Sequence, residues 1–322
     1  MSAIEKQNAP KPSARETGSG MERFNAIRSS TNVFYSALFI FLALLCIVPV
    51  IFVVIISFSS EASIGRAGYS FTPLEWSTDA YEYVWHLRNT RGVPTVVMAF
   101  MTSVGLTLVG TLIGLTLIST MGYVLSRRSF KLRGIYTTLI FIPMIFNGGL
   151  LSTYVVNTQL LGLKNTYWAL IFPICCSSFY VIIMRTFFQT SVPDEIIESG
   201  KVDGASQLRI FLQLVLPISL PALATIALFL TFAYWNDWYQ ASLYIESSKH
   251  DLFPLQYVLV NIEKNIQYLA NNDMAMSANT NVLPTETMRM AIVVIAVVPI
   301  MFSYPFFQKY FISGLTIGAV KG

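Results

Sequence analysis

The segment from Pro193 to Ala205 reads PDEIIESGKVDGA, and the pair Leu216-Pro217 follows a little downstream. This segment is charged and helix-like, yet long apolar segments lie on both sides of it. A polar helix between two membrane spans is not needed to cross a bilayer. The arrangement therefore indicates a membrane protein with a water-facing element that another, soluble subunit contacts.

The composition supports a membrane protein. Of the 322 residues, 54% are hydrophobic and only 12% are charged, whereas a soluble domain carries roughly 25% charged residues. The net charge of +4 is mild, and we attribute it to basic loops at one membrane surface, not to nucleic-acid binding.

Six runs of the sequence contain no Asp, Glu, Lys or Arg, and a helix needs about 20 apolar residues to cross the hydrocarbon layer. The runs are residues 29–60, 92–126, 134–163, 165–184, 210–236 and 290–308. We predict an all-α membrane protein whose six transmembrane helices lie near residues 33–58, 98–126, 134–157, 167–189, 214–243 and 287–308. The runs lack the alternating pattern of membrane β-barrels.

The basic residues predict the orientation, because short cytoplasmic loops are rich in Lys and Arg. The loop 127–133 holds four basic residues and no acid, so we expect it to be cytoplasmic. Six spans then put both termini inside, the loops 59–93 and 246–285 outside, and the loop 190–213 inside.

Three regions follow from this pattern. Residues 1–30 are predicted to form a disordered cytoplasmic tail, without a cleavable signal peptide. Residues 31–310 form the transmembrane domain, with a cytoplasmic loop at 190–216, and residues 311–322 form a cytoplasmic C-terminal tail.

The charged segment is predicted to begin a short helix with Ser191 as its cap and Asp194 at the capping-box position. Asp203-Gly204 is a turn signal, because Gly accepts backbone angles that other residues resist. Ser199 and Gly200 are small, so another surface can approach them closely.

A second short helix is predicted after the turn. Leu208, Phe211, Leu212 and Val215 have the spacing of one apolar helical stripe. On these patterns alone, a solvated cytoplasmic loop with an amphipathic helix at the membrane surface is the favoured interpretation.

The residue pattern resembles the EAA loop through which ABC importer permeases contact their ATPase subunits. Glu198-Ser199-Gly200 stands where that family has Glu-Ala-Ala, Gly204 supplies the following glycine, and Leu216-Pro217 supplies the ending. The chain departs from the family pattern at both alanines. Gly200 weakens the helix by about 1 kcal/mol relative to Ala.

The resemblance extends over roughly residues 30–322. The C-terminal run GLTIGAVKG at 314–322 is similar to the ending of maltose-type carbohydrate permeases. Phe146–Gly149, Ile183–Phe188 and Tyr234–Trp238 resemble segments of a subgroup that carries oligosaccharides and polysaccharide fragments.

The resemblance implies a type I importer permease in a bacterial cytoplasmic (inner) membrane. Its implied partners are a second homologous permease, two ABC ATPase subunits, an extracytoplasmic sugar-binding protein and membrane lipid, with no nucleic acid. ATP and Mg would be bound by the ATPase subunits, and this chain would hold no cofactor. The residues implied to contact the ATPase are Glu198, Ser199, Gly200, Lys201, Asp203, Gly204 and Ala205.

We expect no catalytic residue and no metal site. The chain lacks a phosphate-binding Gly-rich motif, and its two histidines, His86 and His250, lie far apart in predicted external loops. The cysteines Cys46, Cys175 and Cys176 lie in predicted spans, where we interpret them as packing residues.

The sugar path is predicted from polar and aromatic residues beside the spans, because such groups bind saccharides. The candidates are Asn147, Tyr234, Trp235, Asn236, Asp237 and Trp238. An interfacial aromatic belt with a structural Asn-Asp pair would give the same pattern, so this alternative stays open.

Other classes of function fit the sequence less well. An ion-coupled secondary transporter usually shows paired repeats and intramembrane acids, whereas this sequence shows no internal repeat and almost no intramembrane charge. A membrane enzyme needs a nucleophile or metal cluster, and none is visible. Within the importer class, a permease for another solute, such as a polyamine or an amino acid, is the main alternative.

Overall fold

The computed structural model describes residues 29–88, 92–270 and 285–319. In these ranges the regular secondary structure is helical, joined by turns and loops, and the β-structure consists of two isolated bridges. The chain divides into two units, Met1–Phe52 and Val53–Gly322. The predicted disordered tail at 1–30 falls almost entirely outside the described residues.

The first helix, α2, runs from Ser29 to Ser57 and begins in the first unit. Its 29 residues contain no charged side chain, and at 1.5 Å per residue they reach about 43 Å, more than the hydrocarbon layer requires. α2 therefore matches the first predicted span.

Two more helices are long and apolar enough to cross a membrane unbroken. These are α5, Thr95–Ser126, and the first part of α17, Thr285–Ala319. α17 continues through Ala319, so no helix end separates the predicted last span from the predicted tail at 311–322.

Three bent helix pairs complete the set, and counting each pair as one span gives up to six spans. In the first pair, α6 (Arg133–Ile145) is followed by α7 (Gly149–Val155) and η1 (Val156–Leu160) with a bend of 119°. In the second, α8 (Tyr167–Cys175) and α9 (Ser178–Ser191) meet at 47°.

The third pair joins a short helix to α13 at a bend of 82°. The short helix consists of α11 (Gln207–Ile210), η2 (Phe211–Val215) and α12 (Leu216–Ile218), and α13 runs from Leu220 to Trp235. Pro221 has no N–H to donate to the carbonyl of Pro217, and its ring crowds that carbonyl, which explains the break at Ser219. The predicted continuous span at 214–243 is therefore wrong at both ends.

The break after α6 falls at the sequence Asn147-Gly148-Gly149. Gly149 has a φ of +82°, which suits glycine. The side-chain Oδ1 of Asn147 accepts a hydrogen bond from the Gly149 amide at 2.9 Å. This local turn ends α6 and starts α7.

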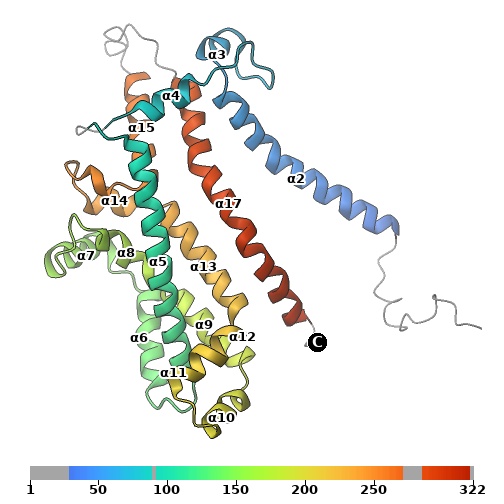
Figure 1. Ribbon diagram of the computed structural model, residues 1–322, viewed down its shortest axis with the longest axis vertical. Coiled ribbons are helices and arrows are strands. Elements are labelled where there is room, and N and C mark those ends of the chain that lie inside the picture. The colour runs from blue at the N-terminus through green and yellow to red at the C-terminus, as the bar shows by residue number, and fades with distance from the viewer. Residues whose placement is uncertain (1–28, 89–91, 271–284, 320–322) are drawn as a thin grey trace, which may run out of the picture. The chain divides into compact units, whose positions relative to one another are not determined.

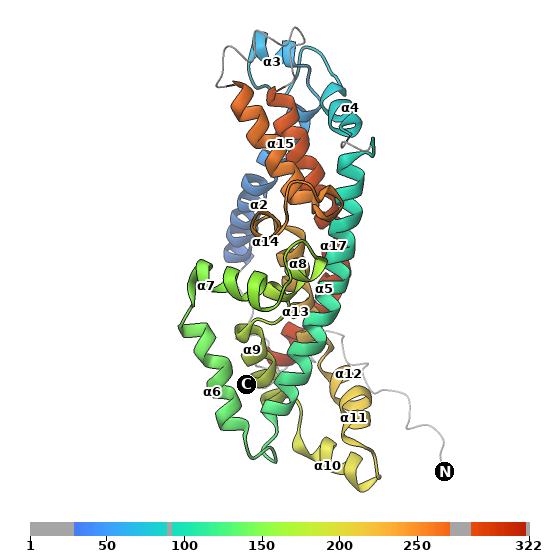
Figure 2. The same ribbon diagram turned by 90° about the vertical axis from the view of Figure 1, so that its left-hand side faces the viewer.

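α5 is the central helix of the second unit and packs against α8, α9 and α13 (Figures 1 and 2). Three of its glycines face these neighbours without room for a side chain: Gly110 meets the Tyr234 ring, Gly114 the Cys175 carbonyl and Gly122 Met184. Small residues let membrane helices approach closely, so these glycines set the spacing of the bundle.

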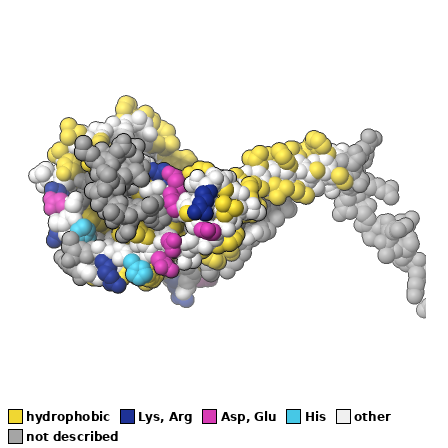
Figure 3. Space-filling model, turned by 90° about the horizontal axis from the view of Figure 1, so that it is seen from above, with side chains coloured by type: hydrophobic (Ala, Val, Ile, Leu, Met, Phe, Trp, Pro, Cys, Tyr) yellow, Lys and Arg dark blue, Asp and Glu magenta, His cyan; other side chains and the backbone are white. Residues whose placement is uncertain are grey.

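The two ends of this unit differ in content. α3 (Glu61–Ala67) and α4 (Asp79–His86) lie at the end where α17 begins, and α10 (Asp194–Val202) lies at the opposite end, beside the last turns of α5 (Figures 1 and 2). Figure 3 shows the face at the α3 end, where acidic, basic and histidine side chains are exposed.

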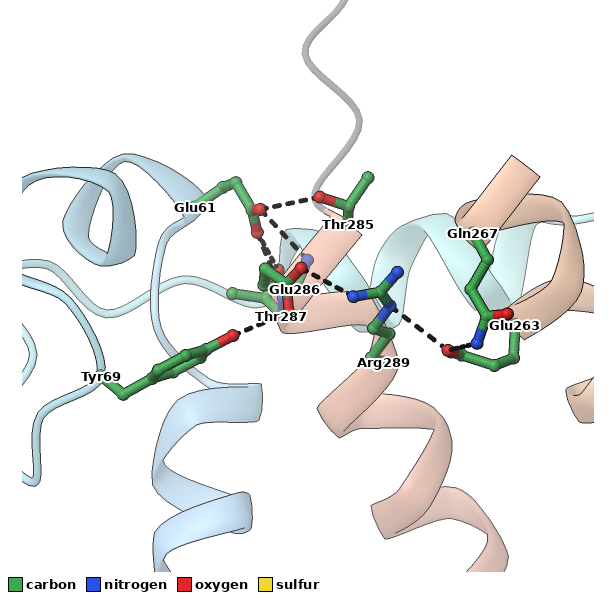
Figure 4. A network of polar contacts seen from close by, with 8 residues as sticks. All are labelled: Glu61, Tyr69, Glu263, Gln267, Thr285, Glu286, Thr287 and Arg289. Carbon is green, nitrogen blue, oxygen red and sulfur yellow. Dashed lines mark hydrogen bonds and ion pairs between the residues drawn. The ribbon is translucent and has the colours of Figure 1, made fainter. Parts of the chain in front are cut away.

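A polar network fastens the start of α17 to α3 (Figure 4). The carboxylate of Glu61 accepts hydrogen bonds from the Thr285 hydroxyl, the Glu286 amide, and the amide and hydroxyl of Thr287, at 3.0–3.2 Å. These amides have no partner inside the helix, so Glu61 acts as a cap supplied from another element.

The network continues to α15, which runs from Leu255 to Ala270. Arg289 pairs with Glu286 at 2.8 Å and with Glu263 of α15 at 3.3 Å. Tyr69 donates to Glu286 at 2.8 Å, and this hydrogen bond, together with burial, raises the pKa of the Tyr69 hydroxyl. Three elements distant in sequence are thus held together at this end.

Candidate coupling site

The helix α10 contains most of the predicted coupling residues. It begins after Pro193, with Asp194 and Glu195 in its first turn, where acidic side chains suit the helix dipole. The prediction that Ser191 caps this helix is wrong, because Ser191 is the last residue of α9. The acids and the proline, not a capping box, define the start of α10.

A tight turn ends α10. The Asp203 amide donates to the Ser199 carbonyl, and the Gly204 and Ala205 amides donate to Lys201 and Gly200, all at 3.0 Å. Gly204 has a φ of +75°, and no atom lies within 4 Å of the place where its Cβ would be. Glycine is therefore suited to this position by its backbone conformation, not by lack of space.

Gly200 has a different role from the one its size suggested. It is buried, and a Cβ there would lie 3.1 Å from Ile210 and from Leu214. The approaching surface is thus the chain's own α11–η2 segment, not another molecule. Ser199, in contrast, is exposed.

The outward surface of α10 and its turn carries charged groups together with apolar ones. Glu198, Lys201 and Asp203 are exposed. Beside them Val202 is 87% exposed and Leu208 66% exposed. We call this set the coupling surface. Of the predicted apolar stripe after the turn, Phe211 and Val215 are buried, whereas Leu208 and Leu212 face outward.

Glu198 and Lys201 form no ion pair with each other among the described residues, although their spacing permits one. Both side chains remain available to a partner. Sequence reasoning missed Val202, because a single valine inside a helix looks like a packing residue.

Arg127 is a second residue that sequence reasoning missed. In the sequence it is only one of the basic residues of the loop 127–133. In the structure its Nη1 lies 3.1 Å from Oδ1 of Asp194. It therefore joins the end of α5 to the start of α10.

The predicted sugar-path residues separate into buried and accessible groups. Tyr234 is buried, and its hydroxyl donates to the Ile171 carbonyl at 2.9 Å. Trp235 is also buried, and its Nε1 donates to the Ala296 carbonyl at 3.0 Å. These two residues fasten α13 to α8 and to α17.

The three residues that follow α13 are more accessible. Asn236 donates to the Phe232 carbonyl at 3.0 Å and accepts from Gln256 at 3.3 Å. The half-buried Asp237 accepts from the Gln240 amide at 3.3 Å, near the start of α14 (Tyr239–Tyr244). Trp238 is exposed, and the ammonium of Lys264 lies 5.5 Å from its ring centroid.

A cleft of about 610 Å³ lies between α15 and α17, and it adjoins these residues through Gln256 and Lys264. Its polar lining consists of Gln256, Glu263, Lys264, Gln267 and Arg289, and the rest is apolar. Asn147 lies on a different element, the break between α6 and α7. In the described part of the chain, no group of three or more His, Cys, Asp or Glu side chains is arranged to hold a metal ion.

Comparisons with known proteins cover most of the chain, including α10 and the Tyr234–Trp238 segment. The family described as "Binding-protein-dependent transport system inner membrane component" matches residues 114–317. A Bacillus subtilis protein named Protein LplC is 38% identical over 86% of this chain and 90% of its own. The Polygalacturonan/rhamnogalacturonan transport system permease protein YtcP of the same organism is 36% identical over 87% of this chain and 94% of its own.

A solved structure has a fold similar to that of this chain. It is a chain from a bacterial ABC transporter involved in the import of the acidic polysaccharide alginate, with a TM-score of 0.74 and 27% identity. The match covers 91% of this chain and 99% of that one. The chain described here therefore belongs to the family of inner membrane components of binding-protein-dependent transport systems, the permease subunits of ABC importers.

Proposed function

We propose that this chain is one permease subunit of an ATP-driven importer for oligosaccharides or polysaccharide fragments. The relatives support a carbohydrate, because their names mention polygalacturonan and rhamnogalacturonan, arabinooligosaccharides, and alginate. A permease subunit itself carries out no hydrolysis, so the work must enter through a contact surface.

The single observation that carries this proposal is the coupling surface. A valine that is 87% exposed, flanked by exposed charges, stands on a helix that projects from the end of the bundle. Interfaces commonly combine an apolar centre with a polar rim. We propose that one ABC ATPase subunit, which binds ATP and Mg, covers this surface.

The full assembly is proposed to hold this permease, a second homologous permease, two ATPase subunits and an extracytoplasmic sugar-binding protein within membrane lipid. The basic loop 127–133 lies at the same end as α10 (Figure 2). Since basic short loops stay inside, we place this end and both termini in the bacterial cytoplasm and the α3 end outside.

The accessible part of the Tyr234–Trp238 segment is proposed to line the sugar path. Trp238 offers an aromatic face and Asn236 offers an amide, which are groups that bind saccharides. Tyr234 and Trp235 support them from the core. We include Asn147 because it is exposed at the break of a membrane span, where backbone groups need a cavity or another protein.

Reconstitution tests the proposal. The permease is purified with the subunits that copurify with it, placed in liposomes, and given binding protein with oligogalacturonides, arabino-oligosaccharides, a polyamine or an amino acid. We expect uptake of one saccharide class that requires ATP. Uptake of only the polyamine or amino acid would contradict the carbohydrate assignment, and uptake driven by an ion gradient without ATP would contradict the importer assignment.

A further inference from the structure

Arg127 directly follows α5 and makes four contacts there. Its Nε donates to the Ser126 hydroxyl at 2.9 Å, and its Nη1 donates to Asp194 of α10 at 3.1 Å. Its Nη2 donates to the Phe188 carbonyl near the end of α9 at 3.0 Å. The guanidinium carbon also lies 5.2 Å from the centroid of the Tyr123 ring.

The Tyr123 ring extends this set of contacts to the segment after α10. Its centroid lies 4.9 Å from that of Phe211 in η2 and 5.9 Å from that of Phe188 in α9. One guanidinium and the ring beneath it therefore touch α5, α9, α10 and η2. The Arg127 side chain is only 12% exposed, so its position is fixed by its surroundings.

The stability of the ion pair does not explain this arrangement. Asp194 is 59% exposed, and water screens the attraction that a solvent-exposed carboxylate adds to an ion pair. What the guanidinium supplies is geometry, because its planar, fixed donors bond several groups at once. A lysine offers a single flexible ammonium and cannot reproduce all of these bonds.

We propose that Arg127 is the positioning residue that transmits movement of α10 to the transmembrane bundle. This inference rests on the proposed function, in which an ATPase subunit moves α10. A displacement of Asp194 would act through the guanidinium on the end of α5, the helix against which α8, α9 and α13 pack. Apart from this side chain, α10 is joined to the bundle by the chain through Val192 and Pro193 and by apolar packing, including buried Ile197.

Four variants of the reconstituted importer test this inference: Arg127→Ala, Arg127→Lys, Asp194→Asn and Arg128→Ala. Arg128 is the matched control, because it is an exposed cation in the same loop. Three quantities are measured: the amount of assembled complex, the basal ATP hydrolysis, and the saccharide imported per ATP hydrolysed.

We expect Arg127→Ala to assemble and hydrolyse ATP while the import per ATP falls about tenfold, a typical size for a lost coupling between sites. The import per ATP should fall less in Asp194→Asn and Arg127→Lys, and in Arg128→Ala it should match the wild type. Because Asp194 is exposed, Asp194→Asn tests the connection between Arg127 and α10 even where Arg127→Ala fails to fold.

An unchanged import per ATP in Arg127→Ala or Asp194→Asn would overturn the inference. A loss that only follows the amount of assembled complex would also overturn it, since Arg127 would then merely support the fold. If the wild-type complex shows no ATP-driven import, the proposed function is wrong, and the inference about Arg127 is wrong with it. The wild-type measurement thus separates the two failures.

Discussion

At the scale of the residue, the coupling surface shows how similar residue types serve different purposes. Gly200 is glycine because α11–η2 packs against it, whereas Gly204 is glycine because its backbone has a positive φ. Val202 is apolar and exposed. An exposed valine contributes no hydrophobic stabilisation to the isolated subunit, because its surface is not removed from water. Each of these differences predicts a different mutational effect.

Val202→Asp should weaken the contact with the ATPase subunit. Burial of an unpaired carboxylate at an interface is costly, so we expect a loss of affinity of about tenfold or more, which corresponds to about 1.4 kcal/mol. The fraction of ATPase that remains bound during purification measures it. Trp76→Ser is the control, because Trp76 is 65% exposed and lies in the chain between α3 and α4, the helices of the opposite end. An equal loss in this control would contradict the assignment.

Gly204→Val should impair coupling, and Gly204→Asn should impair it less. Left-handed backbone costs an ordinary residue roughly 1–2 kcal/mol, and Asn tolerates it better. The space around Gly204 admits either side chain, so the difference should follow backbone preference. The measurement is ATP hydrolysis stimulated by loaded binding protein. Activity of both variants equal to that of the wild type would show that the turn is not needed.

Glu198→Lys reverses an exposed charge on the coupling surface without removing a contact inside the chain. We expect the subunit to insert normally while the stimulated ATP hydrolysis falls, because a cation at this position would repel the partner group that the glutamate attracts. Stimulation equal to that of the wild type would remove Glu198 from the coupling surface.

At the scale of the element, the sequence predicts which segments form helices better than where those helices break. The six charge-free runs correspond to α2, α5, α17 and the three bent pairs. Hydropathy counts apolar residues. It does not register that Pro221 removes a donor, or that Asp237 accepts a hydrogen bond from the Gln240 amide at the start of α14. The charge-free run at 210–236 therefore led to the prediction of one helix near 214–243.

The coupling site was predicted in the same uneven way. The exposed charges and the turn at Gly204 follow from local sequence, because they depend on neighbouring residues. The anchoring of α10 by Arg127 and the packing at Gly200 join residues far apart in the chain or in separate helices. No local pattern indicates such contacts.

The capping of α17 by Glu61 gives a prediction about stability. Glu61→Gln removes the charge that accepts four hydrogen bonds from the first turn of α17. Hydrogen bonds to charged groups contribute about 1.5–3 kcal/mol, so we expect a lower melting temperature in detergent. Glu75→Gln, at an exposed position nearby, is the control, and an equal shift in both variants would contradict the capping role.

At the scale of the whole molecule, the second unit has a polar network at one end and the coupling surface at the other, and α5 runs between the two ends (Figures 1 and 4). The account requires these ends to meet different partners. An ATPase subunit should contact the α10 end, and the α3 end should face the binding protein across the membrane.

Site-specific cross-linking tests this central claim most directly. Val202→Cys and, as its counterpart at the other end, Trp76→Cys are introduced after Cys46, Cys175 and Cys176 have been replaced, and the assembled importer is treated with a thiol-to-amine cross-linker. The account predicts that Val202→Cys becomes joined to the ATPase subunit and Trp76→Cys does not. An ATPase adduct at Trp76→Cys, or a binding-protein adduct at Val202→Cys, would contradict it.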